Sequence, residues 1–225
     1  MNAHDNEASG LMGAVYARNL VDRMFVDLAL SGGSLSHSDK RYVNDNTVAG
    51  GIATAKADYD SWWLSPEIGI GFDLEEKAGD WQLTPSARIR YARQSIDGFT
   101  ETGIATADGN AKVADRTIGM VETRMEIAAS KPMVGNISPS VKDGKVTFRL
   151  GWQTLRAMGD DAVKITLLGD SQNVSYKMDT RNSAYVGSAL SMKLDNGMAL
   201  NLGGEVTLGS GNRQIRATLG LKRAF

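Results

Sequence analysis

The chain has 225 residues, of which 42% are hydrophobic and 23% charged, so it is long enough for a folded domain and too apolar for wholesale disorder. Its 25 Lys and Arg nearly balance its 26 Asp and Glu, which gives no electrostatic basis for binding nucleic acid. With no cysteine and two histidines, disulfides, thiolate metal sites and cysteine nucleophiles are excluded. No run approaches 18 apolar residues and the first residues resemble no signal peptide, so neither a transmembrane helix nor a signal peptide is predicted.

Alternation of apolar and polar residues runs through the chain and predicts β-strands with one apolar and one polar face. The clearest case is 198–208, where Leu200, Leu202 and Val206 alternate with Asn201 and Glu205. In chain order, nine such strands are expected near 11–19 and at 24–30, 64–74, 81–91, 121–127, 146–152, 186–194, 198–208 and 215–221. No convincing helix is predicted between them.

The connections alternate in length. Short turns are expected at 20–23 and 75–80 and around Gly197, which follows an Asp-Asn pair, and long polar connections at 37–60, 94–116 and 157–182. The last of these includes 163–178, which predicts a hairpin outside the membrane or a tenth strand of the barrel.

Two architectures fit these strands: a soluble sandwich, whose apolar faces meet, and a membrane barrel, whose apolar faces meet lipid. Patterns of about ten residues match a tilted strand that crosses a bilayer, whereas sandwich strands average five or six. Aromatic residues near strand ends, Trp62, Trp63, Trp81, Phe72 and Phe225, suit the interfacial girdles of a barrel. The alternation of short and long connections also favours a membrane barrel. We therefore predict an all-β, up-and-down antiparallel transmembrane β-barrel of about nine long strands.

The polar faces carry charges of both signs separated by small residues, as expected of a narrow, hydrated, porin-like lumen. The residues predicted to line that lumen are Asp27, Glu67, Arg88, Arg90, Glu122, Arg124, Glu126, Arg149, Glu205 and Arg216.

Several segments, in order, resemble the β-domain of classical type V autotransporters. They are Gly10 to Ala17, Met24 to Leu30, Ser65 to Gly69, Leu83 to Tyr91, Asp97 to Phe99, and an end on Phe225 after Leu219 to Leu221. The resemblance covers nearly all of residues 1–225. It implies strands four to twelve of a twelve-stranded barrel, with the first strands, a linker helix and an N-terminal passenger absent. It also implies that Leu219, Leu221 and Phe225 form a C-terminal signal for the barrel-assembly machinery. Arg223 departs from the apolar residue usual near that end.

The resemblance implies an outer-membrane translocator and anchor that exports a covalently linked passenger in bacterial type V secretion, in contact with outer-membrane lipid. It implies neither an enzyme nor a cofactor. Two alternatives remain: a soluble or surface β-sandwich adhesin module, and a barrel hydrolase with its site in the outer loops. His37, which lies between Ser36 and Ser38 and two residues before Asp39, is the residue that a hydrolase would use, but loop neighbours rarely have the hydrogen-bond geometry of a triad. No catalytic, metal or nucleic-acid site is therefore predicted.

Overall fold

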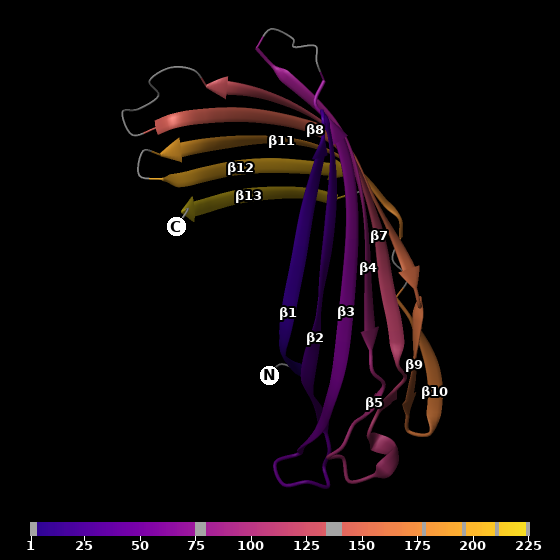
Figure 1. Cartoon of the computed structure of the whole chain (residues 1–225). Helices are drawn as coiled ribbons and strands as arrows, with labels where there is room; N and C mark the ends of the chain where they lie inside the picture. The colour runs from indigo at the N-terminus through magenta and orange to yellow at the C-terminus, as the bar shows by residue number, and fades with distance from the viewer. Residues whose placement is uncertain are drawn as a thin grey trace.

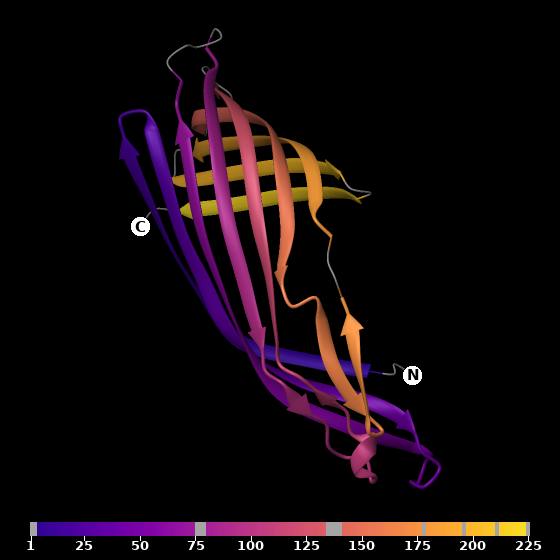
Figure 2. The same cartoon turned by 90° about the vertical axis from the view of Figure 1, so that its right-hand side faces the viewer.

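Nine long antiparallel strands form one sheet in the computed structural model, which describes residues 4–74, 80–133, 141–176, 179–194, 197–209 and 212–223. The strands are β1 (His4–Val21), β2 (Met24–Asn44), β3 (Ile52–Phe72), β4 (Gln82–Ile96), β7 (Arg116–Met133), β8 (Val141–Gly159), β11 (Arg181–Leu194), β12 (Met198–Gly209) and β13 (Asn212–Arg223). Their order in the sheet follows the chain, and the sheet curls into part of a cylinder (Figures 1 and 2). The predicted all-β, up-and-down fold is confirmed.

A two-residue turn joins β1 to β2. Asp22 adopts a left-handed backbone with a φ of 53°, which aspartate tolerates better than most residues. The turn pairs Val21 with Met24 and fixes the register of the whole hairpin, so Arg18 lies directly opposite Asp27.

The alternation separates the two faces of the sheet as the sequence predicts. Leu202 pairs with Leu190 on one side and Leu219 on the other, so the three leucines share one face. Leu202 is 40% exposed and Leu219 is 74% exposed, and many other large apolar side chains of this face are also open. A sandwich would bury these residues against a second sheet. The sandwich alternative is therefore wrong.

A second sheet of four short strands lies at the end of the main sheet where the long connections are. It contains β5 (Phe99–Thr100), β6 (Lys112–Val113), β9 (Ala162–Leu167) and β10 (Asp170–Ser175), in the order β10-β9-β6-β5. The described residues of 163–178 therefore contribute the predicted hairpin, β9–β10, but no tenth strand to the main sheet.

The predicted connection at 37–60 is wrong in its length. Both β2 and β3 extend through 21 residues, and only 45–51 lies between them. A strand tilted by about 45° needs only about ten residues to cross a bilayer, so half of each strand lies beyond a membrane-sized belt. These outer halves consist mainly of polar and small residues with few large apolar side chains, so no long apolar face marks a strand there.

Candidate functional site

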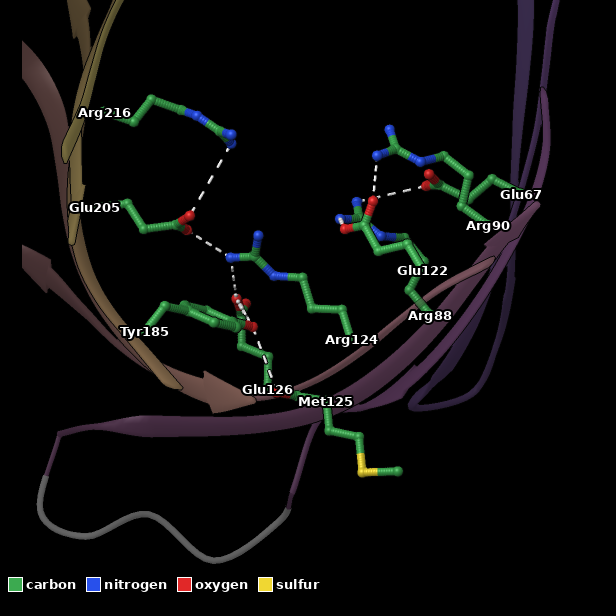
Figure 3. Close-up of polar contacts among 10 residues, drawn as sticks. All are labelled: Glu67, Arg88, Arg90, Glu122, Arg124, Met125, Glu126, Tyr185, Glu205 and Arg216. Atoms are coloured by element: carbon green, nitrogen blue, oxygen red, sulfur yellow. Dashed lines mark hydrogen bonds and ion pairs between the residues drawn. The ribbon is translucent and has the colours of Figure 1, made fainter. Parts of the chain in front are cut away.

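The charged side chains of the main sheet converge on its concave face. Figure 3 shows Arg124 and Glu126 of β7 pointing into the curve, while Met125 between them points away. The same figure places Glu67, Arg88, Arg90, Glu122, Glu205 and Arg216 on the concave side. Asp27 and Arg149 follow by register, because directly opposed residues share a face: Asp27 lies opposite Gly69, which pairs with Arg88, and Arg149 lies opposite Gly187, which pairs with Glu205.

One group of ion pairs crosses β1 to β7. Arg18 Nε and Arg18 Nη2 donate to the carboxylate of Asp27 at 2.6 and 2.7 Å, a two-pronged arrangement. On the next strands, Arg88 lies 3.5 Å from Glu67 and 3.7 Å from Glu122. Arg90 also contacts Glu122. In these contacts each arginine lies against at least one carboxylate, so the charges of this part of the concave face are balanced.

The second group joins strands that are distant in the sequence. Arg124 of β7 donates to Glu205 of β12 at 2.5 Å and lies 3.4 Å from Glu126 (Figure 3). Arg216 lies 4.0 Å from the other oxygen of Glu205. Because Arg124 crosses β8 and β11 to reach Glu205, this contact requires the curvature of the sheet.

Tyr185 lies beneath this second group and is 1% exposed. Its hydroxyl donates to Glu126 at 3.0 Å, and the Arg124 guanidinium lies 3.7 Å from the centre of its ring. The ring covers Gly151, where an added Cβ would lie 2.2 Å from Cζ of Tyr185. Glycine at position 151 therefore makes room for the tyrosine ring that supports Arg124.

The predicted lumen residues differ in their partners. Arg149 lies opposite Ala128 and Gly187, and no ion-pair partner of Arg149 lies among the described residues. Arg18 and Tyr185 are not among the residues that the sequence predicts to line the lumen. Counting back from the turn at Asp22 would have placed Arg18 opposite Asp27, whereas the role of Tyr185 depends on curvature.

Aromatic residues of β3 lie at both margins of the apolar face, but Trp63 is not one of them. Trp62 and Phe72 of β3 are outward-facing and 44% and 47% exposed. Ten residues at about 3.4 Å, tilted by 45°, give a height of about 24 Å between them, close to the ~25 Å band of outer-membrane barrels. Trp63 instead faces the concave side, opposite Gly33, and lines a pocket with Ile118 and Met120, because side chains alternate along a strand. The prediction that Trp63 joins the girdle is wrong.

At the long-loop end, the β4–β7 connection folds onto the tip of β2 and β3. Arg41 Nε donates to Glu101 at 2.9 Å, and the backbone N–H of Ala111 donates to the same carboxylate at 2.7 Å. Burial raises the pKa of Glu101, but these donors outweigh it, so the pKa lies below its usual range. Ala55 is 1% exposed, since this connection covers it. We call the segment 99–113 the outer cap.

His37 lies within β2 rather than in a loop, and its neighbours differ from those a triad needs. Its Nε2 is 2.9 Å from Ser61 Oγ, and its ring stacks on Tyr59 at 4.7 Å. The carboxylate of Asp39 accepts a hydrogen bond from the Tyr59 hydroxyl at 3.1 Å rather than from His37. In the described ranges, no three side chains form a metal-binding group.

No helix in the described part of the chain is long and apolar enough to cross a membrane. A curled, up-and-down sheet with an apolar convex face and a charged concave face defines the class of outer-membrane β-barrels. The family model for the autotransporter β-domain matches residues 1–205, and the chain belongs to that family. It is accordingly an outer-membrane translocator domain for the export of a passenger.

Three relatives are similar to this chain over parts of their length. The chain is similar to the translocator domain of the autotransporter NalP from Neisseria meningitidis, with a TM-score of 0.62 and 16% identity over 98% of this chain and 68% of that one. It is 31% identical over 114 residues to an uncharacterized protein in the trpE-trpG intergenic region of Pseudomonas putida, 47% of this chain and 18% of that protein. It is 27% identical over 100 residues to the esterase EstA of Pseudomonas aeruginosa, 44% of this chain and 15% of that protein. The chain thus matches less than a fifth of these curated relatives' length.

Proposed function

We propose that the concave face lines the hydrated channel of a translocator and that the convex face contacts the lipid of the bacterial outer membrane. The separation of apolar and charged residues on opposite faces of nine strands supports this proposal above all. The long-loop end, with the outer cap, faces the outside of the cell, and the short turns face the periplasm. The passenger is the covalently attached partner of the barrel.

Further strands complete the barrel in this proposal. In the described chain, β1 and β13 each pair with one neighbour, so both edges of the sheet carry unpaired backbone groups. Lipid cannot hydrogen-bond to such groups, which makes an open edge costly at membrane depth. The NalP translocator, of which the chain covers 68%, is larger by an amount that could supply the remaining strands. We therefore place further strands, a linker helix and the passenger before residue 1 in a longer parent protein.

The barrel itself breaks no bond in this proposal. Translocator domains of the family are transporters, and the matched part is a small fraction of the relatives named as esterases. The paired charges of the concave face serve transport, because a neutralised, hydrated wall has few free charges to retain an extended chain.

The barrel-assembly machinery is the second proposed partner. Leu219 and Leu221 lie outward on β13, 74% and 64% exposed, while Phe225 lies outside the described residues. An open edge strand can pair with a receptor by strand addition before the barrel closes. Deleting Phe225 should lower the amount of assembled barrel and increase periplasmic degradation at unchanged transcript level. Unchanged outer-membrane yield would contradict this role.

Fractionation and surface proteolysis test the function directly. The parent protein, carrying an epitope tag in its passenger, is expected in the outer-membrane fraction, with heat-modifiable gel migration and with the tag open to protease added to whole cells. A protein that stays in the buffer-soluble fraction, or a tag that protease reaches only after lysis, would contradict the proposal.

A further inference from the structure

Two arginines lie on the convex face at the margin of the apolar belt nearest the outer cap. Arg93 of β4 lies opposite Leu64 and Gly119, and Arg156 of β8 lies opposite Val121. All of these positions share the outward face, because the register of β3, β4, β7 and β8 is unbroken around them. Both arginines are exposed.

Neither arginine has a counter-ion in the part of the chain that the structure describes. Among the described residues, no carboxylate oxygen lies within ion-pairing distance of Arg93 or Arg156, in contrast to Arg88, Arg90 and Arg124 of the concave face. The guanidinium of Arg93 lies 5.8 Å from the centre of the Trp62 ring, which is an aromatic contact. An arginine at the edge of an apolar belt that has no protein carboxylate beside it is stabilised most by an anion from its surroundings.

Tyr91 completes a cluster between the two arginines. It lies opposite Val121, in the same row as Arg156 and two residues from Arg93. Gly119 is buried, and an added Cβ there would lie 3.6 Å from Cε2 of Tyr91, so the ring leans over the glycine toward β8. The backbones of β4 and β8 are about 10 Å apart, two strand spacings, so two extended arginines can reach one group between them.

An apolar groove begins at the same tyrosine and crosses β4, β3, β2 and β1 on the convex face. Its volume is about 580 Å³, and its outward-facing lining includes Leu28, Leu30, Pro66, Ile68, Ile89 and Tyr91. Tyr91 links the groove to the two arginines, because it lines the groove, lies in the same row as Arg156 and is two residues from Arg93.

We propose that Arg93, Arg156 and the Tyr91 hydroxyl bind the phosphate group of an outer-leaflet glycolipid whose acyl chain lies in this groove. Guanidinium groups recognise phosphate through paired N–H donors, and a phenol adds a further donor. The groove accounts for the apolar part of the same molecule, which a free phosphate lacks. The inference rests on the proposed membrane orientation, because only then does this margin meet lipid headgroups.

Binding of lipid A to the full-length parent protein in detergent tests the site. Native mass spectrometry would compare bisphosphorylated lipid A with the same lipid after removal of its phosphates. The wild type is expected to bind the phosphorylated form at least about tenfold more tightly, and Arg93→Ala/Arg156→Ala should abolish that preference. The matched control is Arg213→Ala, since Arg213 is an exposed outward-facing arginine of β13 opposite Leu208; it should keep the preference. Heat-modifiable migration of each variant verifies that its barrel is folded.

Three results would overturn the site. The first is equal binding of both lipids by the wild type, and the second is an equal loss from Arg213→Ala, which would indicate a general effect of surface charge. The third is complete displacement of lipid A by 50 mM inorganic phosphate, roughly a physiological ionic strength, which would indicate a site for free phosphate. None of these results affects export of the passenger, so failure of the lipid site is distinguishable from failure of the translocator function.

Discussion

Arginine at Leu202 should destabilise the barrel far more than arginine at the adjacent Asn201. Leu202 faces outward on β12, which runs from Met198 to Gly209. It lies 1.5 residues from the middle of that strand, about 4 Å from the belt centre at 3.4 Å per residue and a 45° tilt. At that depth a lipid-facing arginine costs about 2–4 kcal/mol. Asn201 faces the concave side and accepts a hydrogen bond from Ser191 at 2.7 Å, so its replacement should cost about 1 kcal/mol.

Urea unfolding of the parent protein in phosphatidylcholine vesicles measures both costs, with tryptophan fluorescence as the signal. The two substitutions place the same charged side chain at neighbouring positions, so the difference in their costs reports which face each position occupies. An Asn201→Arg variant as unstable as Leu202→Arg, or more so, would refute the assignment of the two faces.

Further predictions concern the concave face and the outer cap. Glu205→Gln should cost about 1–3 kcal/mol in the same unfolding assay, because Arg124 loses the charge of its 2.5 Å partner. Unchanged stability would contradict this. Gly151→Ala should cost about 1–3 kcal/mol, because an added Cβ would lie 2.2 Å from the Tyr185 ring and 2.4 Å from the backbone oxygen of Met125; unchanged stability would be inconsistent with these contacts. The stabilising effect of Glu101 on the outer cap should be complete above its ordinary pKa of 4.5 and lost as the pH falls through its lowered pKa. Limited proteolysis from pH 7 to pH 3 should show this loss, and Glu101→Gln should remove the pH dependence; a cap equally resistant at every pH would contradict it.

The faces and order of the strands follow from sequence because the side-chain period of a strand is two. At 198–208, one alternating run determines which residues face outward, and the short turns make sequence neighbours pair. The outer halves of β2 and β3 could not be predicted in this way. At these positions neither face is apolar, and the strands persist because they pair with neighbours already aligned inside the belt.

Contacts across the concave face cannot be predicted from the local alternation of residues, because they depend on the curvature of the sheet. Arg124 and Glu205 are 81 residues apart in sequence and meet because the sheet curls. Trp63 next to Trp62 shows a related limit: composition places both at a strand end, whereas only the register decides which one faces outward.

The alternation of water and lipid contact along β12 tests the central claim most directly. The chain has no cysteine, so spin labels can be attached at single cysteines introduced from 200 to 208 in the parent protein in lipid vesicles. We expect labels at 200, 202, 206 and 208 to collide with oxygen dissolved in lipid, and labels at 201, 203, 205 and 207 to collide with a water-soluble nickel chelate. Loss of this two-residue period, or its inversion, would contradict the account.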